Sequence, residues 1–161
     1  MAKSKKKLPK HDSKSKKELT VIRPNAQKEV HIGSNPNKFG NTMPKWTFAR
    51  VDKDSWTIHD TFINTILEKL IQYESMTWNE IMNMTRQGRN SNNTMNHNIP
   101  RGALIKSAQQ RLDQLKIYED EIFSLSLDNK KRLWGILDSG VFQIIWYDSN
   151  HEICVSKKKH T

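Results

Sequence analysis

Three side chains in the last third of the chain have the types that bind phosphate and transfer protons: Arg132, Tyr147 and His151. Histidine exchanges a proton near neutral pH, and an arginine guanidinium grips a phosphate through paired hydrogen bonds. RNA cleavage by internal attack needs both: a base removes the 2′-hydroxyl proton, cations stabilise the charged phosphate, and an acid protonates the departing 5′ oxygen. We therefore predict that Arg132 binds phosphate, that His151 is the acid or base, and that Tyr147 assists by stacking or hydrogen bonding.

These candidates lie at the open end of a predicted β-hairpin. Two apolar segments, residues 132–137 and 141–147, are separated by an Asp-Ser-Gly turn in which the glycine can take a positive φ. A two-residue loop places Arg132 opposite Tyr147, and a three-residue loop places it opposite Trp146. The sequence leaves both registers open, and both bring Arg132 to the end of the sheet that carries the proton-transfer candidates.

Each candidate also has a simpler structural role. His151 could close a turn with its ring held by Asp148, and Tyr147 could be an aromatic residue at the rim of the core. The run Lys130-Lys131-Arg132 could be a solvated turn at a strand edge. We assign Trp134 and Trp146 to the core.

We expect no metal and no small-molecule cofactor. His151 and Cys154 have a spacing that zinc sites use, but no second pair of ligands accompanies them. The sequence contains no phosphate-binding loop, no nucleophile elbow and no paired-carboxylate motif. Cys154 is the only cysteine, so no internal disulfide forms, which fits a reducing compartment. No apolar run approaches the length of a membrane span, and we expect a cytoplasmic protein without a membrane partner.

The net charge of +10 belongs to the two ends of the chain. Residues 1–17 contain eight Lys and one Asp, a net charge of +7, and residues 155–161 contribute +3. The remainder is balanced. Such ends attract polyanions with a strong salt dependence, so RNA or the ribosome is the expected partner, although a tail that only aids solubility has the same composition. The candidate nucleic-acid-binding residues are Lys5, Lys6, Lys7, Lys130, Lys131, Lys157, Lys158 and Lys159.

The chain divides into a Lys-rich disordered tail and linker over residues 1–44, a domain over residues 45–155 and a basic tail over residues 156–161. The predicted helices are residues 58–73, with Thr57 and Asp60 at its start, a short helix opened by the capping box of Thr77 and Glu80, and a third running from Pro100 to Lys116. The polar segment 87–98 is predicted to be a loop.

The predicted strands are residues 45–51, 123–127, 132–137, 141–147 and 152–155. The strand 123–127 alternates apolar residues with Ser124 and Ser126, which indicates that one of its faces is solvated. The resulting order of elements predicts an α+β fold, in which an antiparallel meander sheet is packed by two or three helices.

The segment from Ile122 to His151, IFSLSLDNKKRLWGILDSGVFQIIWYDSNH, resembles the RelE/ParE toxin superfamily. That family has a strand, a turn, a strand that opens with Arg, an acidic turn, an apolar strand and a polar end. The matching positions here are Phe123–Leu127, Arg132–Gly135, Asp138, Phe142–Trp146 and His151. The resemblance covers roughly residues 45–155 and implies a RelE-like fold.

RelE-like members are mRNA endoribonucleases, ribosome-dependent or free, that a cognate antitoxin protein neutralises. The resemblance thus implies a nuclease in which Arg132, His151 and Tyr147 are catalytic. The chain departs from the family where many members carry basic residues on the first meander strand, since Ser124 and Ser126 stand there. Two other functions stay open: a non-catalytic nucleic-acid- or ribosome-binding protein that uses its Lys-rich tails, and a ParE-like protein that binds a protein target such as gyrase.

Overall fold

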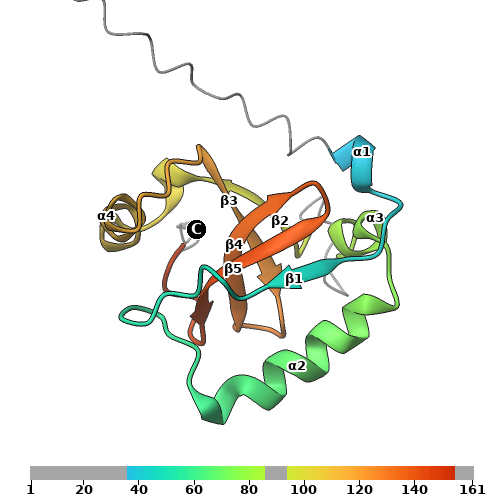
Figure 1. The fold of residues 1–161 in the computed structure, drawn as a ribbon, viewed down its shortest axis with the longest axis horizontal. Helices are drawn as coiled ribbons and strands as arrows, with labels where there is room; N and C mark the ends of the chain where they lie inside the picture. The colour runs from blue at the N-terminus through green and yellow to red at the C-terminus, as the bar shows by residue number, and fades with distance from the viewer. Residues whose placement is uncertain (1–35, 86–93, 155–161) are drawn as a thin grey trace, which may run out of the picture. The chain divides into compact units, whose positions relative to one another are not determined.

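The structure is a computed structural model, and it describes residues 36–85 and 94–154 (Figure 1). In chain order the elements are α1 (Pro36–Phe39), β1 (Lys45–Thr47), α2 (Asp60–Glu74), α3 (Trp78–Met82), β2 (His97–Pro100), the 3-10 helix η2 (Arg101–Ala103), α4 (Lys106–Gln114), β3 (Glu121–Ser126), β4 (Arg132–Asp138) and β5 (Val141–Asp148). The predicted tails lie outside the described residues, except for residues 36–44. Those tails include Lys5, Lys6, Lys7, Lys157, Lys158 and Lys159.

Five strands form one sheet in the order β1-β5-β4-β3-β2. The pairs β2–β3, β3–β4 and β4–β5 are antiparallel, whereas β1 runs parallel to β5, with Trp46 opposite Phe142. The α+β class is confirmed, but the prediction of a purely antiparallel sheet was wrong, because the sheet is mixed. A parallel pair needs a long connection, and the chain from α2 to β4 supplies it between β1 and β5. The apolar pattern of β1 does not encode this direction.

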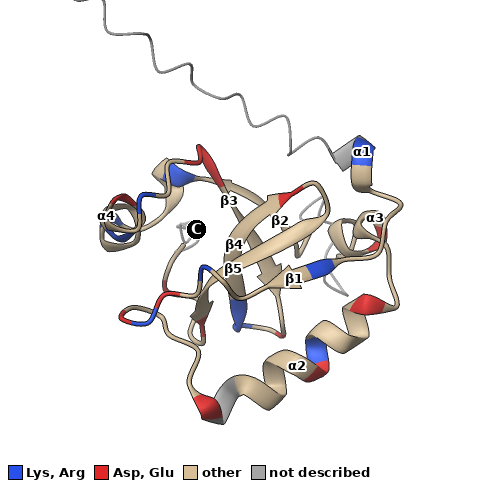
Figure 2. Ribbon diagram, viewed as in Figure 1, with Lys and Arg blue, Asp and Glu red and all other residues tan. Residues whose placement is uncertain are grey.

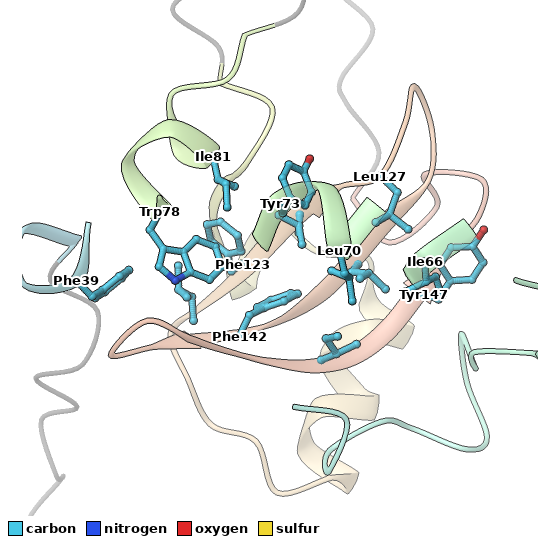
Figure 3. Close-up of a cluster of buried hydrophobic side chains, with 14 residues drawn as sticks. Phe39, Ile66, Leu70, Tyr73, Trp78, Ile81, Phe123, Leu127, Phe142 and Tyr147 are labelled. Atoms are coloured by element: carbon cyan, nitrogen blue, oxygen red, sulfur yellow. The ribbon is translucent and has the colours of Figure 1, made fainter. Parts of the chain in front are cut away.

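Buried side chains form a separate core on each face of the sheet. The first core lies under α2 and α3 and is drawn in Figure 3; its members are Phe39, Ile66, Leu70, Tyr73, Trp78, Ile81, Phe123, Leu125, Leu127, Leu133, Leu137, Phe142, Ile144 and Tyr147. The second core lies under α4; its members are Leu104, Ala108, Leu112, Ile117, Ile122, Trp134, Ile136, Ile145, Trp146 and Ile153. Trp134 and Trp146 are core residues, as predicted.

Because helices cover both faces, the central strands have no solvated side. Ser124 and Ser126 are 3% and 0% exposed, so the prediction of a half-buried strand was wrong for β3. The backbone N–H of Ser126 donates to the side-chain oxygen of the buried Asn96, 2.7 Å away. Asn96 in turn donates to the carbonyl of Ile81 at 2.7 Å. A polar residue of the predicted 87–98 loop therefore fastens α3 to β3.

The helices follow the predicted apolar spacing more closely than the predicted caps. The capping box is confirmed, because Thr77 accepts from the backbone of Glu80 and the Glu80 carboxylate accepts from the backbone of Thr77. The helix α2 instead begins after His59, which makes no side-chain cap, so the predicted start at Thr57 was wrong.

Four predicted boundaries differ from the structure. The strand predicted over residues 45–51 is shorter, because β1 ends at Thr47. Part of the predicted loop, His97 and Asn98, belongs to strand β2 paired with β3, while residues 87–93 lie outside the described residues. Pro100 ends β2, and α4 begins only at Lys106. Residues 152–154 do not form the predicted strand. No helix within the described ranges has the length and apolar character needed to cross a membrane.

Candidate functional site

A β-bulge sets which residues meet at the open end of the β4–β5 hairpin. The loop is Ser139-Gly140, because Asp138 pairs with Val141, but the register shifts between Trp134 and Gly135. One extra residue on β5 moves every later pair along by one position. Arg132 therefore lies opposite Asp148, and neither of the two predicted partners, Tyr147 and Trp146, faces it.

This register places Arg132 and Tyr147 on opposite faces of the sheet. Tyr147 pairs with Leu133, which is a member of the first core, and neighbouring residues on a strand point to opposite faces. Tyr147 is 3% exposed, and Figure 3 shows its ring at one end of the first core with the hydroxyl directed away from the cluster. Burial raises the pKa of this hydroxyl, so it stays protonated at neutral pH. The structure does not bring Tyr147 to a common surface with Arg132.

Asp148 closes the turn after β5 through the backbone. Its carboxylate accepts from the backbone N–H of Asn150 at 3.2 Å, of Glu152 at 3.0 Å and of Ile153 at 3.0 Å. We considered above that Asp148 could close the turn by holding the ring of His151. The Asp148 carboxylate bonds backbone N–H groups instead. His151 is partly exposed, with a left-handed backbone at φ 64°, and its ring makes no hydrogen bond within residues 36–85 and 94–154. The imidazole is thus partly exposed beside the end of β5.

The turn before β4 carries three consecutive cationic residues in a fixed conformation. The Asp128 carboxylate accepts from the backbone N–H of Lys130 at 3.0 Å and of Lys131 at 2.9 Å, and it also lies 3.3 Å from the Lys131 ammonium. Burial opposes its ionisation, but these donors outweigh burial and lower the pKa of Asp128. The carboxylate is therefore ionised at neutral pH and orders the turn.

Arg132 takes part in the same turn. Its Nη1 atom donates to the Ser126 hydroxyl at 2.9 Å and to the carbonyl oxygens of Asp128 at 2.7 Å and Lys131 at 2.9 Å. Lys130 is exposed and forms no ion pair within the described part of the chain. Figure 2 shows the beginning of β4 in blue, at the end of the sheet where β5 finishes. The three cations Lys130, Lys131 and Arg132 outnumber the neighbouring carboxylates of Asp128 and Asp148, so this turn has a net positive charge, which suits a phosphate.

The chain between β1 and α2 lies along the free edge of β5. The backbone N–H of Asp52 donates to the carbonyl of Ile145 at 2.9 Å, and that of Tyr147 donates to the carbonyl of Trp56 at 2.8 Å. The Trp56 ring packs against Trp146, with ring centroids 5.1 Å apart. Sequence reasoning missed Trp56, because no local pattern shows that this loop returns to β5.

The buried Asp52 fastens this loop. Its carboxylate accepts from the Arg111 guanidinium at 2.7 and 2.6 Å, from the Trp146 indole N–H at 3.0 Å and from the backbone N–H of Asp54 at 2.9 Å. Burial disfavours the charged form, but Arg111 and the other donors hold the pKa of Asp52 well below its usual range. One carboxylate thereby joins α4, β5 and the loop that carries Trp56.

Within the described residues, no three His, Cys, Asp or Glu side chains gather as a metal site would need. Cys154 donates its thiol to the Ala103 carbonyl at 3.6 Å. No family model, curated protein or solved structure matches this chain.

Proposed function

We propose that the protein is a RelE-like, cytoplasmic RNA-binding protein that contacts phosphate through the turn Lys130–Arg132 and cleaves RNA with His151. The observation that supports it is the position of this turn. Asp128 fixes its backbone, and Arg132 pairs with Asp148, the last residue of β5 before the turn that carries His151. A cation and a partly exposed imidazole at one end of the sheet are the minimum that phosphodiester cleavage by internal attack requires.

The distribution of charge supports RNA as the partner. The two ends of the chain hold the whole net charge of +10, while residues 18–154 are balanced. The ends supply long-range attraction to any polyanion, which depends on salt and not on sequence. The ordered turn then gives a fixed point at which a phosphate is held. In this proposal Tyr147 supports β5 from within the first core, and it does not contact RNA.

The test compares RNA cleavage by the full-length protein with cleavage by His151→Ala and Arg132→Lys, on naked RNA and on translating ribosomes. We expect wild-type cleavage, and a loss of about 100-fold or more in the His151 variant, since general acid–base catalysis contributes that much. Arg132→Lys keeps the charge but loses the paired geometry, so it separates phosphate recognition from simple attraction. The matched control is His97→Ala, an exposed histidine on β2.

Cleavage that survives in both variants would overturn the proposed site. RNA binding by wild-type protein without any cleavage would instead favour a non-catalytic RNA-binding function, in which the turn and the tails only bind RNA. Circular dichroism of each variant is required, because the Arg132 Nη1 atom also bonds the turn itself.

A second candidate function is the binding of a protein partner, either a cognate antitoxin or a ParE-like target. The observation that favours it is an apolar row on the outer side of α2. Leu67 and Ile71 are 42% and 63% exposed, one helical turn apart, and Ile63 continues the row as a partly buried residue. Helices that bind a groove or another helix use this spacing.

This candidate is tested by co-expressing the protein with the product of the adjoining reading frame. We expect the two to co-purify, and the double variant Leu67→Gln, Ile71→Gln to lose the partner while keeping its thermal stability. The variant Asn64→Gln, at an exposed polar position of the same helix, is the control. Retention of the partner by the double variant would show that α2 is not the contact.

A further inference from the structure

Two residues with unfavourable backbone conformations flank the end of β5. Trp56 has φ 46° and His151 has φ 64°, in the left-handed region that bulky side chains rarely adopt. Such strain persists only where the surroundings enforce it, and it concentrates at ligand-binding positions. His151 already belongs to the proposed site, whereas Trp56 has no part in it.

The contacts that hold Trp56 fix the direction of its ring. Its carbonyl accepts from Tyr147, and its ring lies against Trp146 at an interplanar angle of 59°. Trp146 is itself immobilised, because it is fully buried and its indole N–H donates to Asp52. Trp56 packs against the second core but remains only partly buried. The strained backbone thus holds a large aromatic side chain at the surface in a single orientation.

Trp56 and Arg132, the last residue of the cationic turn, lie on the same face at the same end of the sheet. Trp134 pairs with Trp146, and Arg132 precedes Trp134 by two positions, so all three strand residues face the second core. The loop at Trp56 borders one edge of β5, and β4 borders the other. Two strand spacings give about 10 Å between Trp56 and the start of β4. A short length of single-stranded RNA spans that distance.

We infer that Trp56 is a stacking residue for a base of single-stranded RNA whose phosphate lies on the turn Lys130–Arg132. The inference rests on the proposed RNA binding and adds a residue that distinguishes RNA from other polyanions. Aromatic rings bind bases of any sequence, because every base has a π-face. Cations alone attract phosphate whether or not a base is present. Trp56 would therefore contact the bases, which the charged turn and the Lys-rich ends do not recognise.

The experiment measures affinity of the full-length protein for a single-stranded RNA oligonucleotide and for inorganic polyphosphate of equal charge, at one salt concentration. We expect Trp56→Leu to bind RNA roughly 5- to 150-fold more weakly, the range for loss of one stacked base, and to bind polyphosphate as wild type does. Trp56→Phe should keep most of the RNA affinity. The control is Phe48→Leu, since Phe48 is an aromatic residue of the same loop with 40% exposure.

Three outcomes would overturn the inference while leaving RNA binding in place: equal RNA affinity of Trp56→Leu and wild type, equal loss in Phe48→Leu, or a parallel loss of polyphosphate binding. A second measurement needs no variant and so does not depend on folding. Wild-type protein should bind an oligonucleotide with abasic positions more weakly than the intact RNA by a similar factor, and equal binding would contradict stacking. Failure of wild-type protein to bind RNA at all would instead overturn the proposed function, and this inference with it.

Discussion

The buried carboxylate of Asp52 holds the loop that carries Trp56 against β5. Asp52 receives hydrogen bonds from α4, from β5 and from its own loop. It therefore connects parts of the chain that are far apart in sequence. A buried charge is tolerated only when its lone pairs are satisfied, and here three donor groups give the carboxylate four hydrogen bonds. The position of Trp56 therefore depends on the ionisation of one residue outside the site.

Replacing Asp52 by Asn should destabilise the protein by on the order of 3 kcal/mol at pH 7, because Arg111 loses its buried charged partner and keeps only the exposed Asp54, 2.6 Å away. The folded-state pKa of Asp52 is depressed below the ordinary value near 3.9. The stabilisation is then complete above about pH 5 and is lost as the pH falls through the folded-state pKa. Urea unfolding at pH 7, 5, 4 and 3 should show the gap between wild type and variant closing below about pH 4.

Glu121→Gln is the control for this titration, because Glu121 is an exposed residue of β3. It should lose stability with acid in step with wild type. A gap between wild type and the Asp52 variant that stays constant down to pH 3 would contradict the assigned ionisation.

At the scale of the strand, the bulge between β4 and β5 determines which side chains share a face. Gly135 stands at the register shift, where a Cβ atom would lie 2.1 Å from the carbonyl oxygen of Gln143 and 2.9 Å from the Phe142 ring. Only glycine permits that approach of two strands. Without the bulge, Arg132 would pair with Tyr147, and the residues of β5 beyond the shift would change faces relative to β4.

Gly135→Ala should therefore destabilise the protein by about 3 kcal/mol, since the clash is with backbone that cannot move aside. Gly102→Ala is the matched control, because nothing lies within 4 Å of the added atom. Denaturant unfolding of both variants measures the difference. If Gly135→Ala unfolded at the wild-type midpoint, the close approach at the bulge would not depend on glycine.

Over the whole molecule, charge and structure are divided between different parts of the chain. The ends carry the net charge of +10, and the balanced remainder builds the two cores and the site. Attraction and recognition of a polyanion are then separate properties, because the first depends on the number of cations and the second on fixed geometry. This division predicts a distinct salt dependence for each part.

Replacing the eight Lys of residues 1–17 by Gln in the full chain should flatten the dependence of RNA affinity on salt. For single strands the logarithmic slope changes by about 0.7 per phosphate contact, so the loss approaches about 6 if all eight lysines touch phosphate. Fluorescence anisotropy titrations between low and physiological salt measure it. A shuffled order of the same residues should keep the wild-type slope, and a shuffled variant with the flattened slope would show that the segment acts by sequence and not by charge.

The local elements could be predicted from the sequence, because their causes lie within a few residues. The helical apolar spacing, the capping box at Thr77, the β4–β5 hairpin and the charged ends are all of this kind. The two-residue loop at Ser139 was one of the two registers that the sequence allowed. The α+β class followed from the order of these elements.

The pairing of distant segments was decided only by the tertiary structure. The sequence does not show that β1 runs parallel to β5, that helices bury both sides of Ser124, or that a bulge moves Arg132 from Tyr147 to Asp148. Each depends on packing between residues tens of positions apart, which no local period records. For the same reason the sequence could not show that Tyr147 lies in the first core, or that the loop of Asp52 and Trp56 reaches β5, where Trp146 is 94 residues from Asp52 along the chain.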